Sequence, residues 1–284
     1  MHNSNTISKP RDPFFDLLKV WAIFMVIVQH MIAACGYGLN MMNTPVGKII
    51  CMFNMPLFMG ITGYFFRKSL TLSIRDIFKS KWISWLRPTL IFSILLVGWR
   101  LLVGVLPYPD MWKKVVVYFL YDFLACYWFI PVAFLCCLIS RISYKIYPNI
   151  AISGLIQWLV LVIFPFGNFY PILAYLKAMY PFFILGLLCR YYDWISIIRK
   201  QPLIIGLCSL ILFILLFPWF NKYRFFYSFT IISVQEMIIN YGALLVAGIS
   251  GSILSIIFIH FMDKYNLLGN PYLSKLGNKR FQFI

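Results

Sequence analysis

The sequence predicts an all-α, polytopic transmembrane helix bundle, and three observations lead to this fold class. Of its 284 residues, 62% are hydrophobic and only 12% are charged, about half the charged fraction of a typical soluble domain. The mean hydropathy is +0.84. The apolar residues gather in runs of about 20, the length that a helix needs to cross the hydrocarbon core of a bilayer.

Eight apolar runs are long enough to be predicted as membrane spans. The first holds 21 residues, from Phe14 to Ala34, and its successors are separated by links that carry glycine, proline or charged residues. The longest early link, Leu106–Asp122, is rich in aromatic residues and is predicted to lie at the membrane interface. The other seven predicted spans are approximately Val46–Phe66, Ile83–Val105, Phe123–Ile139, Ile150–Phe166, Ile172–Leu188, Leu203–Phe220 and Tyr241–Met262.

The distribution of positive charge predicts the orientation of the spans. The chain carries 25 Lys and Arg against 8 Asp and Glu, a formal net charge of +17. If the N-terminus is cytoplasmic, sixteen basic residues outside the spans fall on that side and four fall on the other. The positive-inside rule therefore places both termini in the cytoplasm, as expected of a multi-pass protein of the inner (cytoplasmic) membrane.

The domain organisation follows from the same pattern. Residues 1–284 are predicted to form one transmembrane domain, with a cytoplasmic arm at 1–13, the helical bundle at 14–262 and a cytoplasmic tail at 263–284. The basic residues flank the spans and build no separate basic domain, which favours contact with anionic membrane lipid and excludes nucleic acid as a partner. The seven cysteines show no paired CxxC spacing, so neither a metal site nor a disulfide framework is predicted.

Three ionisable side chains interrupt the first apolar run: Asp16, Lys19 and His30. At 100° per residue, Lys19 and His30 point within about 20° of each other, and Asp16 lies about 40° from His30, so all three share one helix face. Charges are costly in lipid and normally face a bundle interior or a wet cavity, which makes this stripe the first candidate site. The alternative is a snorkelling pair at Asp16 and Lys19 with a hydrogen-bonded core histidine.

Further cations lie at the start of the third predicted span. Lys79 and Lys81 belong to the basic loop before it and Arg87 lies at its entry, and together with Lys19 they could hold an anionic ligand at the cytoplasmic surface. The alternative for Lys79 and Lys81 is a role in topology alone, and for Arg87 a role as an interface anchor.

Five sequence blocks, in order along the chain, resemble the membrane acyltransferase-3 family, whose members O-acylate cell-surface sugars and related acceptors. Asp16, Lys19 and His30 are similar to the family's first-helix signature, with Lys where Arg is common. Thr62 stands where the family usually has Ser, and only one of its paired arginines is present, at Arg87. The blocks that carry the resemblance are Asp16–His30, Asn54–Phe66, Ser84–Pro88, Tyr127–Pro131 and Tyr180–Gly186.

The resemblance implies a membrane O-acyltransferase that moves an acyl group, in the first instance acetyl, from cytoplasmic acyl-CoA to a glycan or lipid-linked sugar acceptor. Acyl-CoA is then a substrate, and no bound cofactor is expected. His30 is the expected general base, because histidine can take and return a proton near neutral pH. Asp16, Lys19, Lys81 and Arg87 are the expected substrate-binding residues, and His30 is expected to point into the bundle beside the second or third span.

Two alternatives stay open at the level of sequence. A proton-coupled secondary transporter could use Asp16, Lys19 and His30 as a relay, although no internal repeat supports it. The family pattern implies ten spans where eight are counted, so an inactive, C-terminally shortened member is the other alternative. Absence of a final helix pair predicts an exposed groove on the last span, with candidate residues Gly242, Gly248, Ser250, Gly251 and Ser252.

Overall fold

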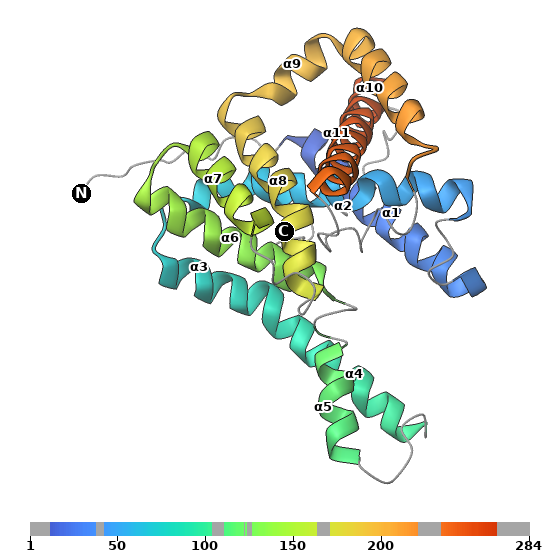
Figure 1. Cartoon of the computed structure of the whole chain (residues 1–284), viewed down its shortest axis with the longest axis vertical. Helices are drawn as coiled ribbons and strands as arrows, with labels where there is room; N and C mark the ends of the chain where they lie inside the picture. The colour runs from blue at the N-terminus through green and yellow to red at the C-terminus, as the bar shows by residue number, and fades with distance from the viewer. Residues whose placement is uncertain are drawn as a thin grey trace.

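The computed structural model describes residues 12–37, 43–103, 111–121, 123, 127–163, 171–220 and 234–265, and this part of the chain is all-α (Figure 1). Most helices begin at the signals that the sequence carries. Asp12 caps the first helix by accepting a hydrogen bond from the Phe14 amide at 3.1 Å, and Thr44 caps the second through the Gly47 amide. The helices are α1 Pro13–Ile32, α2 Pro45–Phe66, α3 Ile74–Lys81, α4 Arg87–Leu102, α5 Met111–Tyr121, α6 Phe129–Ile146, α7 Ile150–Ile163, α8 Pro171–Tyr191, α9 Trp194–Lys200, α10 Pro202–Leu216 and α11 Val234–Lys264, with short π or 3₁₀ segments η1 Ala33–Tyr37, η3 Arg67–Ser69 and η4 Trp82–Leu86.

Within the described residues, six helices are long and apolar enough to cross a membrane, or seven if the bent pair α9 and α10 forms one span. The all-α membrane fold is thereby confirmed, but the number eight is not. The predicted fifth span corresponds to α7, whose 14 described residues extend about 21 Å; residues 164–166 of that prediction lie outside the described part of the chain. The predicted seventh corresponds to α10, which meets α9 at 100° because Gln201 leaves the helical conformation directly before Pro202.

Helix α2 is the centre of the bundle. Its apolar window is 78% buried, the largest share among the candidate spans, and α1, α8 and α11 surround it (Figure 1). Glycines bring α8 against α2: a Cβ at Gly63 would lie 2.8 Å from the Phe183 carbonyl carbon, and one at Gly186 would lie 2.9 Å from the Tyr64 nitrogen. Small residues at such crossings are how membrane helices obtain close packing.

Helix α11 packs on α2 in the same way. A Cβ at Gly248 would lie 2.8 Å from Pro56 Cγ of α2, and one at Gly251 would lie 3.2 Å from Phe53 Cγ of α2. The same Cβ atoms would also meet Phe182 of α8 and Phe213 of α10. Ser250 is buried as well. The prediction of an exposed groove is therefore wrong for Gly248, Ser250 and Gly251, because α2, α8 and α10 already occupy that face. Ser252 is half-buried, and a Cβ at Gly242 would meet nothing within 4 Å.

Side-chain contacts gather the basic residues at one end of the bundle. Arg190 donates to the Tyr64 hydroxyl at 2.7 Å, which joins the C-terminal ends of α8 and α2. Arg199 of α9 pairs with Asp12 at 3.7 Å and with Asp263 at 3.8 Å, which joins the start of α1 to the end of α11. We call this region the basic end. Its assignment to the cytoplasm stays a proposal from the positive-inside rule.

The helix that follows α2 in the bundle is continuous from Ile74 to Leu102 through α3, η4 and α4. Its second half leaves the bundle and forms a projecting hairpin with α5 (Figure 1). The first half therefore lies against α6, as the contact between the rings of Phe78 and Phe134 at 5.5 Å shows. The candidate site described below lies between this half of the helix and helices α1 and α2.

Candidate functional site

Helix α1 presents a packed face and a polar flank. Phe14, Leu18, Ala22 and Gln29 are buried at spacings of four and seven, so one stripe of the helix faces its neighbours. The stripe of Asp16, Lys19 and His30 lies beside that face, roughly 100° around the helix from Ala22. Ile23 lies on the same flank, four residues after Lys19 and seven before His30.

A buried amide pair sets the rotation of α1 near His30. The Asn54 side chain of α2 donates a hydrogen bond to the side-chain oxygen of Gln29, and Asn54 is 0% exposed. Asn54 also accepts a hydrogen bond from the Met55 amide at 2.7 Å. Because polar groups buried between membrane helices are costly without a partner, this pair holds Gln29 against α2 and turns the adjacent His30 onto the polar flank.

The opposite wall contains a π-helical turn. In η4 the amide of Arg87 bonds to the carbonyl of Trp82, five residues earlier. Pro88 follows at once and has no amide to donate, which removes one of the ordinary i−4 bonds of an α-helix. Such π segments are frequent at functional sites, and this one rotates Ser84, Trp85 and Thr89 toward the space between the helices.

That space is a cavity of about 470 Å³, within the range of small-molecule sites. Most of its wall is apolar or aromatic, and four hydroxyl-bearing side chains interrupt it. Three of the hydroxyls donate to backbone carbonyls of their own helices: Thr62 to Phe58, and Ser84 and Thr89 to the residues four before them, at 2.8–2.9 Å. We call it the hydroxyl cavity. Its lining residues are Ile23, Phe58, Thr62, Ser84, Trp85, Pro88, Thr89, Phe92, Tyr127, Phe129, Ile130 and Ala133.

Of the predicted cations, Lys81 contacts a wall residue of the hydroxyl cavity. Its ammonium group sits 3.9 Å from the centre of the Trp85 ring, and Trp85 is part of the cavity wall. Arg87 is exposed instead, because the π turn directs its neighbours, rather than Arg87 itself, toward the cavity.

The first-helix residues lie around the hydroxyl cavity and not in its wall. Lys19 places its ammonium group 4.0 Å from the centre of the Phe65 ring, and Asp16 is half-buried. His30 is exposed within the described residues, so the prediction that it points into the bundle is wrong. Its direction differs by only about 20° from that of Ile23, seven residues earlier, so His30 lies on the flank that borders the cavity, about 10 Å further along the helix.

Sequence reasoning missed two features of the fold. Lys177 of α8 is only 4% exposed and lies in the apolar run from Ile172 to Cys189, of which it is the only charged residue. A charge in that position is a functional candidate by default, so the sequence held the signal. Arg190 and Arg199 were read as topology charges, and their contacts with Tyr64 and Asp263 could not be found from spacing alone.

Comparison with known proteins adds one match. A sequence-family model described as an acyltransferase domain matches residues 12–278, nearly the whole chain. No curated protein and no solved structure matches the chain.

Proposed function

Because the chain belongs to the acyltransferase-3 family of integral-membrane acyltransferases, we propose that it transfers an acetyl group from acetyl-CoA to a hydroxyl of a cell-surface or exopolysaccharide sugar. Acyltransferase activity and a multi-pass location in a membrane follow from the family. The acetyl group, the sugar acceptor and the inner membrane are the parts that we add. The transporter alternative has no comparable support.

One observation carries the proposal: sequence blocks far apart in the chain converge on one cavity. Thr62, Ser84 and Tyr127 come from three separate blocks of the family resemblance, and all three line the hydroxyl cavity. Ile23, which lies between Lys19 and His30, brings the first-helix block to the same wall. A cavity of this size, with mostly apolar walls and a few hydroxyl groups, suits the thioester arm of acyl-CoA better than a charged sugar.

The chemistry requires one base. The acceptor hydroxyl oxygen attacks the thioester carbonyl carbon, the carbon–sulfur bond breaks, and the coenzyme leaves as a thiolate. We assign His30 to take the hydroxyl proton during attack and to pass it to the leaving thiolate, so that no net proton is consumed. The exposure of His30 is compatible with a role at the mouth of the cavity, where an acceptor too large to enter would meet the acyl group.

The donor's phosphates would then lie beside Lys81 and Lys19. Lys81 is held on Trp85 at the cavity wall, and Lys19 is held on Phe65 of α2. We propose that these two ammonium groups bind the nucleotide phosphates, with Asp16 and Arg87 shaping the entrance. Lys19 and His30 are separated by about 16 Å along the helix, a distance that an extended thioester arm bridges.

The test is chemical analysis of surface glycans. Four strains are compared by mass spectrometry of released glycans. They are cells with the gene, cells without it, and cells without it that carry a plasmid for either the His30→Ala variant or the wild-type protein. Each hydroxyl that becomes an acetyl ester gains about 42 Da. The proposal predicts this increment in the strain with the gene and in the strain with the wild-type plasmid, and in neither of the others. Identical glycan masses in all four strains would refute it.

A further inference from the structure

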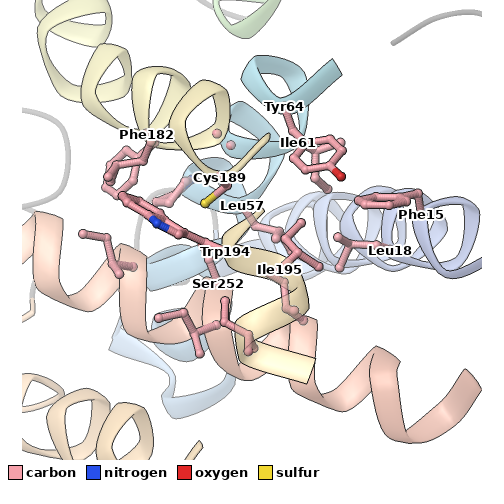
Figure 2. Close-up of a pocket in the computed structure, with 18 of the residues that line it drawn as sticks. Phe15, Leu18, Leu57, Ile61, Tyr64, Phe182, Cys189, Trp194, Ile195 and Ser252 are labelled. Carbon is pink, nitrogen blue, oxygen red and sulfur yellow. The ribbon is translucent and has the colours of Figure 1, made fainter. Parts of the chain in front are cut away.

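A second cavity lies on another side of α2, at the basic end of the bundle. It measures about 160 Å³, and five helices enclose it: α1, α2, α8, α9 and α11. Figure 2 shows Leu18, Ile61 and Ile195 directed toward the same space from three of these helices. We call it the apolar cavity. Its lining shares no residue with that of the hydroxyl cavity, and its link to the proposed reaction is Phe65, on whose ring the Lys19 ammonium lies.

The walls of the apolar cavity favour hydrocarbon. Its lining is almost entirely aliphatic and aromatic. Besides the Trp194 indole N–H and the Cys189 thiol it carries two hydroxyl groups, and both hydroxyls are already hydrogen-bonded. The Tyr64 hydroxyl accepts from Arg190 at 2.7 Å, and the Ser252 hydroxyl donates to the Gly248 carbonyl at 2.6 Å. A dry cavity of about 150 Å³ binds benzene in another protein, so this one has room for about six carbon atoms. Within a bilayer, the hydrocarbon at hand is a lipid chain.

One available cation, Arg190, contacts a wall residue of the same cavity. The Arg190 guanidinium lies 5.1 Å from the centre of the Tyr64 ring, so one ring separates the charge from the cavity. Arg190 forms no ion pair within the described residues, whereas Arg199 on the other side is neutralised by Asp12 and Asp263. An available cation beside a hydrocarbon pocket between membrane helices matches the headgroup of an anionic lipid.

Helix α9 closes the cavity from the side of the membrane surface. Trp194, Ile195 and Ile198 line the cavity, while Lys200 is exposed. The bend of 100° between α9 and α10 turns this short helix away from the direction of α10, which fits a helix lying at the end of the bundle. An interfacial helix with an apolar inner side and a basic outer side is the arrangement that anchors lipid headgroups.

From these observations we propose that the apolar cavity is a specific site for one anionic phospholipid, with about six carbons of one fatty acyl chain between α2, α8 and α11 and its phosphate at Arg190. The proposal is independent of the reaction proposed above, because no residue of the hydroxyl cavity takes part.

The test uses native mass spectrometry of the full-length protein, purified in detergent and supplied with either dioleoyl phosphatidylglycerol or dioleoyl phosphatidylcholine. Wild type is expected to retain one phosphatidylglycerol at least tenfold more than phosphatidylcholine. Ser252→Leu fills the cavity and should lower phosphatidylglycerol retention tenfold or more, whereas Ser252→Ala leaves the space and should retain it. Arg190→Gln should remove the preference for phosphatidylglycerol. The matched control is Arg141→Gln, which should keep the preference, because the Arg141 guanidinium donates to the Leu72 carbonyl instead.

A second measurement needs no variant and so does not depend on folding of Ser252→Leu. Cys189 lines the apolar cavity, and Cys208 is exposed on α10 as an internal reference. Phosphatidylglycerol is expected to slow N-ethylmaleimide labelling of Cys189 about fivefold relative to phosphatidylcholine, with Cys208 labelling unchanged. Two results of the retention experiment would overturn the proposal: equal retention of the two lipids by wild type, or full retention of phosphatidylglycerol by a folded Ser252→Leu variant. A rate of Cys189 labelling that is the same with both lipids would also overturn it.

Discussion

Two sides of α2 differ in what they offer to a ligand. On one side, Phe58 and Thr62 face the hydroxyl cavity, which has a volume of about 470 Å³. On the other, Leu57, Ile61 and Tyr64 face the apolar cavity of about 160 Å³. These two sets of residues point roughly 110° apart on one helix, so the same element serves two purposes.

The difference arises from how the neighbouring helices approach. On the side of the hydroxyl cavity, the π turn at Trp82–Leu86 keeps a wall of hydroxyl groups away from α2 and leaves space. On the other side, glycines at positions 63 and 186 let α8 touch the α2 backbone, and a smaller cavity remains between α1, α2, α8, α9 and α11. We propose that one side of α2 serves the transfer reaction and the other serves close packing, so substitutions on the two sides should have different consequences.

The largest effect is expected for His30→Ala. Loss of a general base typically lowers the rate by about 10²–10⁴-fold, so kcat should fall by a factor in this range. The amount of protein in the membrane should stay near wild type, because an exposed side chain contributes little to packing. The measurement is transfer of radiolabelled acetyl from acetyl-CoA to envelope material.

The control for that variant is another histidine. His260 accepts a hydrogen bond from Arg199 at 3.3 Å at the basic end, and His260→Gln keeps an acceptor there, so its rate should stay within about threefold of wild type. Full activity in His30→Ala would contradict the assignment of the base.

Next in size is Gly186→Ala, on the packing side. The added Cβ would lie 2.9 Å from the Tyr64 nitrogen, a backbone atom, so the helices must separate at a cost of about 1–3 kcal/mol. Thermal unfolding in detergent should show a lower Tm. In the matched variant Gly98→Ala, the new Cβ meets nothing within 4 Å, and stability should not fall. An equal Tm for both variants would show that the close crossing is unimportant.

A smaller effect is expected for Ser84→Phe, which places a ring in the hydroxyl cavity. The acetyl-CoA KM should rise about tenfold, equivalent to about 1.4 kcal/mol, with little change in Tm. Ser80→Phe is the matched control, because Ser80 is exposed one turn earlier. If both variants raise KM equally, the cavity is not where the donor binds.

The smallest effect is expected for Lys19→Arg. An arginine preserves the contact with the Phe65 ring, now 4.0 Å from the Lys19 ammonium, and can bind phosphate with two donors. The KM for acetyl-CoA should fall or change by less than about threefold. A large increase in KM would mean that the compact ammonium group has a role that arginine cannot fill.

Much of this arrangement was predictable from the sequence, and the exceptions have physical causes. The long spans and the shared face of Asp16, Lys19 and His30 follow from length and period alone. The bend before Pro202 and the short α7 were missed because apolar runs do not reveal where a helix breaks. The hydroxyl cavity could not be predicted from the sequence either, because it depends on the π turn and on contacts between helices far apart in sequence.

The measurement that tests the central claim most directly is photocrosslinking with an acyl-CoA analogue whose acyl group carries a diazirine. Crosslinked peptides are then identified by mass spectrometry. Since α2 borders both cavities, the decisive peptides are those of α4 and α6 on one side and of α9 and α11 on the other. Our account predicts adducts on α4 and α6, at or near Thr89, Phe92 and Ile130, that excess acetyl-CoA suppresses. Adducts confined to α9 and α11 would contradict it.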